Sequence, residues 1–98
     1  MATISTEVLA RYAADAAREV AGVQDLVESP LHRHKGVRVL SGDEGVRVEL
    51  HLAVDWGASI PDIGRAVQEG VAAYLARMAS IELEAVDVVV DEVRPLVQ

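Results

Sequence analysis

VRVELHLAVD, at residues 46–55, is the stretch of sequence that decides the fold. Apolar and polar side chains alternate along it, which is the period of a β-strand with one buried and one solvated face. The apolar positions are Val46, Val48, Leu50, Leu52 and Val54. Before it come a strand-like segment at residues 36–40 and the string SGDEG at residues 41–45, whose residue types favour a turn. The sequence therefore predicts a β-hairpin.

Two predicted helices flank this hairpin along the chain. Residues 5–20 carry apolar side chains at helical spacing behind a serine that suits an N-cap. Residues 59–79 begin with a second such serine and a proline, and they carry a second apolar stripe. This stripe consists of Ile60, Ile63, Val67, Val71, Tyr74, Leu75 and Met78. Glycine inside a helix costs about 1 kcal/mol relative to alanine, so Gly64 and Gly70 predict close packing against the sheet or the first helix.

Two further segments complete the predicted order of elements. Residues 23–28 form a short candidate strand, and residues 81–93 form the last strand. The apolar residues of the last strand change phase near residues 84–85, which predicts a β-bulge or a bend there. The order α-β-β-β-α-β predicts a single α+β domain over residues 1–98, with a mainly antiparallel sheet and two helices packed on one face.

Composition excludes several classes of function. The chain has no cysteine, no phenylalanine, one tryptophan and two tyrosines, so thiol chemistry and disulfides are excluded and aromatic ligand pockets are disfavoured. Its net charge of −7 comes from 16 acidic and 9 basic residues, which disfavours nucleic acid and anionic lipid as direct partners. We find no secretory signal and no apolar run of about 18 residues, so we expect a cytoplasmic protein with no direct insertion into a membrane.

His32 and His34 are the best candidates for metal ligands. In an extended segment their imidazoles share one side, and His51 with Glu49 or Asp55 would complete a site. We favour a solvated loop instead, because the sequence lacks the H-E-x-x-H and H-x-x-E-H patterns. We accordingly predict no metal and no cofactor.

Arg33, Lys35 and Arg38 form a basic cluster with the two histidines. Such a cluster would receive phosphate, RNA or the acidic tail of a partner protein. Three cations without a stacking aromatic side chain give little grip on a nucleic acid, so we favour a basic turn on an acidic surface.

The last strand is rich in carboxylates and also carries a candidate interface residue. The carboxylates are Glu82, Glu84, Asp87, Asp91 and Glu92. Paired carboxylates can act as acid and base, but we favour a solvated strand face or a charge-guarded edge. Val89 falls among them on the face predicted to be outward, and a lone Trp56 ends the hairpin strand. A lone tryptophan is usually a core residue, yet tryptophan is enriched at interfaces, so both residues are interface candidates.

Several short strings along the chain carry a resemblance to a known family. They are AAREVAGV at 16–23, GVRV at 36–39, VRVEL at 46–50, VDWGASIPD at 54–62, VQEGV at 67–71 and VDVVV at 86–90. Taken in this order, over roughly residues 4–93, the set resembles the alkaline-shock-protein family of bacterial envelope-stress proteins. The W-G-x-x-I-P and V-Q-x-x-V strings make the resemblance specific.

The resemblance implies a non-enzymatic scaffold protein that self-associates and is tethered to the inner face of the membrane by a small membrane-anchored partner. It transfers no catalytic residue. The sequence lacks the charged terminal tails of many members, and its loop at residues 31–35 is its own. Two other hypotheses for the function stay open. One is a small metal-dependent or acid–base enzyme that uses His32 and His34, and the other is an RNA-binding domain.

Overall fold

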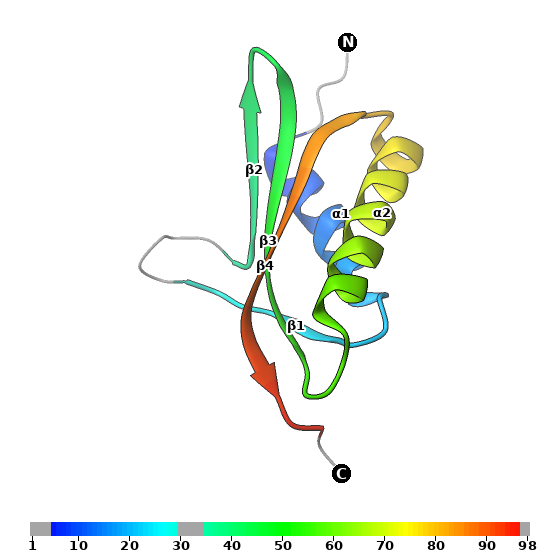
Figure 1. Ribbon diagram of the computed structural model, residues 1–98. Helices are drawn as coiled ribbons and strands as arrows, with labels where there is room; N and C mark the ends of the chain where they lie inside the picture. Colours follow the sequence, from blue (N-terminus) through cyan, green and yellow to red (C-terminus); the bar gives the residue numbers. More distant parts are fainter. Residues whose placement is uncertain (1–4, 30–34, 97–98) are drawn as a thin grey trace.

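A computed structural model describes residues 5–29 and 35–96 of the chain. The elements are α1 (Thr6–Arg18), β1 (Val23–Leu26), β2 (Val37–Gly42), β3 (Gly45–Asp55), α2 (Ile60–Ala79) and β4 (Leu83–Arg94). This is the predicted order, and both helices lie on one side of the sheet (Figure 1). Ser5 and Ser59 cap the two helices as predicted, each accepting a backbone N–H with its hydroxyl oxygen.

β3 is the central strand of the sheet. β2 pairs antiparallel with its first half and β1 with its second half, while β4 runs parallel to it along its whole length. β1 and β2 therefore share one edge of β3, and β4 occupies the other. The prediction of an α+β fold with a mainly antiparallel sheet is confirmed. The parallel strand follows from the connection, because α2 carries the chain back to the start of β3 before β4 begins.

Two bulges interrupt the pairing of β4 with β3. Val46 pairs with Leu83 and Arg47 with Ala85, which leaves Glu84 as an extra residue and confirms the predicted bulge. A second register shift lies between the partners of Leu52 and Ala53 and leaves Asp91 as the extra residue. This second bulge was not predicted.

The hydrophobic core lies between the sheet and the helices. The apolar positions of β3 from Val48 to Val54 have no exposed surface, nor do Val67, Val71 and Leu75 of α2. Burial of each such side chain contributes roughly 1.5–3 kcal/mol. From α1 the core takes mainly alanines, which let that helix lie close to its neighbours. No helix in the described part of the chain is both long and apolar enough to span a membrane.

The predicted apolar face of α2 was wrong at its two ends. Ile60 is 44% exposed and Met78 is 46% exposed, so neither side chain belongs to the buried face of α2. The close packing predicted for the helix glycines was wrong as well. A Cβ on Gly64 would meet no atom within 4 Å, and one on Gly70 would lie 4.0 Å from Val20 Cγ2, which is an ordinary contact.

Candidate interaction surface

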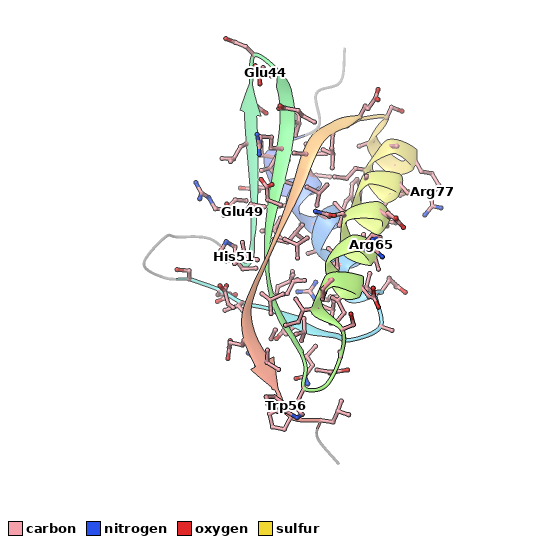
Figure 2. The ribbon with its side chains drawn as sticks, viewed as in Figure 1. Glu44, Glu49, His51, Trp56, Arg65 and Arg77 are labelled. Carbon is pink, nitrogen blue, oxygen red and sulfur yellow. The ribbon has the colours of Figure 1, made fainter. Side chains whose placement is uncertain are left out.

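The face of the sheet opposite the helices is the first candidate surface, and we call it the open face. Alternate residues of three strands point to it, as the strand period requires. They are Arg38 and Leu40 of β2, Arg47, Glu49, His51 and Ala53 of β3, and Asp87, Val89 and Asp91 of β4. Figure 2 shows Glu49 and His51 on the side of the sheet away from α1 and α2.

His51 is held between two carboxylates at the centre of this face. Its Nδ1 lies 2.8 Å from Asp91 Oδ2, and its Nε2 lies 2.9 Å from Glu49 Oε2. Arg38 extends the chain of charges, with its Nη1 at 3.5 Å from the same Glu49 oxygen. The second bulge of β4 supplies Asp91, so this arrangement depends on the sheet register and not on local sequence alone.

These contacts determine the protonation of His51. Partial burial by itself lowers its pKa, but the hydrogen bonds to Glu49 and Asp91 outweigh burial and raise the pKa above its ordinary value. The hydrogen bond from His51 in turn holds the pKa of Glu49 below its ordinary value. When His51 is protonated, both of its N–H groups can donate to these carboxylates, and the ring then has no lone pair for a metal ion.

The structure places only some of the predicted metal-site residues next to one another. His51 does lie beside Glu49, but Asp55 lies elsewhere and accepts a hydrogen bond from Gln24 Nε2 at 2.9 Å. Among residues 5–29 and 35–96, no group of three or more histidine, aspartate or glutamate side chains is arranged to hold a metal ion. His32 and His34 lie outside the described residues.

Two carboxylates of β4, Asp87 and Glu92, are each paired with an arginine. Asp87 Oδ2 lies 3.2 Å from Arg47 Nη2 across the open face, and Glu92 Oε2 lies 3.0 Å from Arg94 Nη2. This arrangement fits the predicted solvated strand face. It does not provide the pair of neighbouring carboxyl groups that acid–base chemistry would use.

The two apolar interface candidates are exposed but lie apart. Val89 is 38% exposed on the open face, where it pairs with His51 of β3. Trp56 is 73% exposed, so the core interpretation of this residue was wrong. It lies just beyond the end of β3, and its backbone N–H donates to the carbonyl of Arg94 at 2.8 Å. At a strand rise of about 3.3 Å per residue, Val89 and Trp56 are roughly 17 Å apart along the sheet.

Two of the predicted basic residues line a groove between α1 and β2, which we call the α1/β2 groove. Lys35 and Arg38 lie on its β2 side, and Arg11 and Arg18 lie on its α1 side. Sequence reasoning missed the two arginines of α1. Their seven-residue spacing on a helix was the available signal, because it places both on one stripe. Arg33 lies outside the described residues.

A smaller groove separates α2 from β4. It is lined by the exposed Ile60, by Gly64 and by the apolar side chains of Val88 and Val90. No atom lies within 4 Å of the Cβ position of Gly64, so the groove is open there. Gln68 closes part of it, because its Nε2 donates to the carbonyl of Val86 on β4 at 3.1 Å.

The sequence of this chain is similar to a known protein family and to a bacterial relative. Residues 1–95 match the alkaline shock protein 23 family, which is described by a cell envelope-related function. The chain is 30% identical over 95 residues to the uncharacterized protein YqhY of Bacillus subtilis strain 168, an alignment that covers 87% of this chain and 70% of that protein.

Solved structures with a similar fold are forms of the MamM CTD. A zinc form of one substituted variant has a TM-score of 0.67 and 20% identity, and covers 92% of this chain and 87% of that one. A doubly substituted variant has a TM-score of 0.66 and 18% identity, and covers 91% and 84%. At these identities the likeness shows the fold alone.

Proposed function

Because the chain belongs to the alkaline shock protein 23 family, whose function is cell envelope-related, we propose that it is a non-enzymatic scaffold. It acts by binding a second copy of itself and a partner protein at the envelope. The observation that carries this proposal is the open face, a sheet surface that neither helix covers and that presents exposed Val89 and Leu40.

The chemistry of the open face supports binding over catalysis. Its charged groups are engaged with one another, in the pairs Arg47–Asp87 and Arg38–Glu49 and in the two contacts of His51. Groups held in this way are poorly placed to take up or release a substrate proton. Exposed apolar side chains such as Val89 and Leu40 lie among these charged groups, and a mixture of apolar and polar surface is usual in protein interfaces.

The pattern of charge also supports self-association. Cations and carboxylates alternate across the open face, with Arg38 and Arg47 beside Glu49 and Asp87. A second copy related by a two-fold axis presents the same pattern in reverse and can set each sign against its opposite. Two such faces packed about 10 Å apart would bury Val89 of both copies.

The experiment compares the mass of purified variants by light scattering. Val89→Glu places a carboxylate in the centre of the proposed contact, so we expect association to weaken at least about ten-fold, as for an interface hot spot. Trp56→Ala should weaken it less, since Trp56 lies toward one end of the sheet. Helix content by circular dichroism should be unchanged, because both side chains are exposed.

Met78→Glu is the matched control. Met78 is 46% exposed, as apolar as Val89, and lies on α2 away from the open face, so this variant should keep the mass of the parent protein. The proposal fails if neither Val89→Glu nor Trp56→Ala changes the mass. Capture of partners from the native host, after lysis that preserves membranes, then tests the link to the envelope by comparing parent and Val89→Glu baits.

A further inference from the structure

The α1/β2 groove has an apolar floor and a charged rim, and it has a volume of about 680 Å³. Leu26, Val37 and Val39 form the floor, together with two alanines of α1. Val37 and Val39 are only partly buried, although they pack against the core. An occupant would therefore bury apolar surface here and not merely touch charged side chains.

The rim of the groove is basic on a protein that is acidic. Arg11, Arg18, Lys35 and Arg38 line it with a single carboxylate, that of Glu7, although the whole chain has a net charge of −7. Arg18 has a partner, Asp15 at 3.8 Å, and the guanidinium of Arg38 lies on the open face, 3.5 Å from Glu49. Within the described part of the chain, Arg11 and Lys35 take part in no ion pair. The groove thus favours an anionic occupant.

The backbone of β2 favours an occupant that is itself a polypeptide. In the described sheet β2 pairs with β3 alone, so its other edge runs along the groove. The carbonyl of Gly36 accepts the N–H of His51 at 2.8 Å, and this bond shows which residues of the strand direct their backbone groups toward β3. The backbone groups of successive residues point alternately toward β3 and away from it. Those of Gly36 point toward β3, so the N–H and C=O groups of Val37 and Val39 point away from β3 and toward the groove. A phosphate or a lipid headgroup would leave such a row of groups without partners.

We propose that the α1/β2 groove binds an extended acidic segment of a partner protein, which adds to the sheet as a strand along β2. Backbone hydrogen bonds to β2 would supply affinity, and carboxylates facing Arg11 and Lys35 would supply specificity. Small apolar residues alternating with the carboxylates would fill the floor above Leu26. This inference rests on the proposed function as an interaction protein and names the kind of partner.

A second copy of this chain is the less suitable source of that strand. Its acidic strand, β4, has the right charge, but α2 flanks β4 across the smaller groove. Gln68 of α2 also donates to the carbonyl of Val86 and thereby occupies part of that edge. A segment that is extended and unpaired in its own protein meets neither obstacle.

The test is a titration of the isotope-labelled full chain, followed by nuclear magnetic resonance. The probe is a capped synthetic peptide of about eight residues, the usual length of a strand, in which valine and glutamate alternate. We expect the largest shifts at the amides of Val37 and Val39 and a fall in affinity as salt is raised. The same peptide with lysine in place of glutamate should cause no such shifts.

Two double variants of equal net charge locate the site. Arg11→Glu with Lys35→Glu should weaken binding of the glutamate peptide at least about ten-fold, since charge-assisted contacts are replaced by repulsion. Arg65→Glu with Arg77→Glu changes two exposed cations of α2 and should leave the affinity within about two-fold, because long-range effects are screened. Both pairs of side chains are exposed, so both variants should fold.

Several results would overturn the inference. These are absence of binding, equal binding of the lysine peptide, equal weakening in both double variants, or shifts confined to the open face. Single-stranded oligouridylate and phosphatidylglycerol vesicles are run as parallel probes, and tighter binding of either at Val37 and Val39 would assign the groove to that ligand instead. Val89→Glu should still bind the peptide, so loss of self-association and loss of peptide binding are separate outcomes.

Discussion

Gly22 is the residue at which the turn after α1 comes close to α2. It lies in the turn after α1 with φ at +96°, and a Cβ there would lie 2.7 Å from Ile63 Cδ1 of α2. Only glycine avoids both the strained backbone and the clash. A Cβ at this position would force the Ile63 side chain to move.

We predict that Gly22→Ala lowers the free energy of unfolding by more than Gly57→Ala does. Gly57 has a similar φ of +87° but open space around its Cβ position, so it reports the backbone cost alone, about 1–2 kcal/mol. Overpacking at Ile63 should add roughly 1 kcal/mol or more in Gly22→Ala. Urea unfolding of the two variants measures the difference, and equal losses would contradict the packing argument.

His51 links protonation to stability at the same scale. Its pKa is raised in the folded chain, so its contribution is fully present below the ordinary value of 6.5 and is lost as pH rises through the raised value. The pKa of Glu49 is lowered, so its contribution is present above the ordinary value of 4.5 and is lost as pH falls through the lowered value. The stabilising bridge therefore operates from mildly acidic pH up to the raised pKa of His51.

We predict that His51→Gln destabilises the protein more at about pH 6 than at a pH above the raised pKa of His51, where the imidazole is neutral between Glu49 and Asp91. The difference should be about 0.5–1 kcal/mol, as for partly exposed ion pairs. Urea unfolding of parent and variant at both pH values provides the measurement. If His51→Gln lowers the free energy of unfolding by the same amount at both pH values, the contacts with Glu49 and Asp91 do not depend on the charge of His51.

At the scale of elements, α2 carries two glycines that the fold does not require. Gly64 lies within the helix, and a Cβ added there would meet no atom within 4 Å. We predict that Gly64→Ala raises the free energy of unfolding by about 0.5–1 kcal/mol, because alanine favours the helix. Thermal or urea unfolding tests this, with Gly70→Ala as a comparison that meets Val20. A loss of stability in Gly64→Ala would show that the residue serves the groove beside β4.

Elements with a strong period were predictable from the sequence, and features set by neighbouring strands were not. The alternation in β3 and the apolar stripes of α1 and α2 predicted those elements within a few residues. The direction of β4 could not be deduced in this way, because parallel and antiparallel strands share a period of two. The bulge at Glu84 was visible as a change of phase, whereas the bulge at Asp91 left no such sign.

The residues of the candidate surfaces were likewise predictable only where a local sequence pattern marks them. Val89 and the basic residues Lys35 and Arg38 were predicted, since strand alternation and a polar loop both indicate exposure. Arg11 and Arg18 were missed, because only the packing of α1 against β2 brings them to the same groove. The carboxylate of Asp91 reaches His51 through sheet register, which no local pattern encodes.

At the scale of the whole molecule, the long strands produce an elongated shape of 48 × 28 × 22 Å. The open face extends along this length. Val89 lies near the middle of the open face, where it pairs with His51. Trp56 lies at one end of the molecule (Figure 2). A standard interface covers about 800 Å² on each partner, which is wide enough to include both residues.

We predict that Trp56 reports this association directly, since it is the sole tryptophan of the chain and is 73% exposed. Dilute protein should show strong quenching of fluorescence by acrylamide, and the quenching should decrease as concentration drives association. Val89→Glu should stay strongly quenched at concentrations that protect the parent. Quenching independent of concentration, in a sample that light scattering shows to associate, would place Trp56 outside the contact.

The position of β3 between its neighbours has a consequence for how the chain reaches this structure. β1 and β2 precede β3 in the sequence and pair with one edge of it, so this part of the sheet can form once β3 has left the ribosome. The other edge must wait for α2 and then for β4, whose pairing spans the greatest distance along the chain. Contacts between distant segments form slowly, so docking of β4 is the expected rate-limiting step. Until then the nascent chain exposes an apolar strand edge, and aggregation competes with folding during that interval.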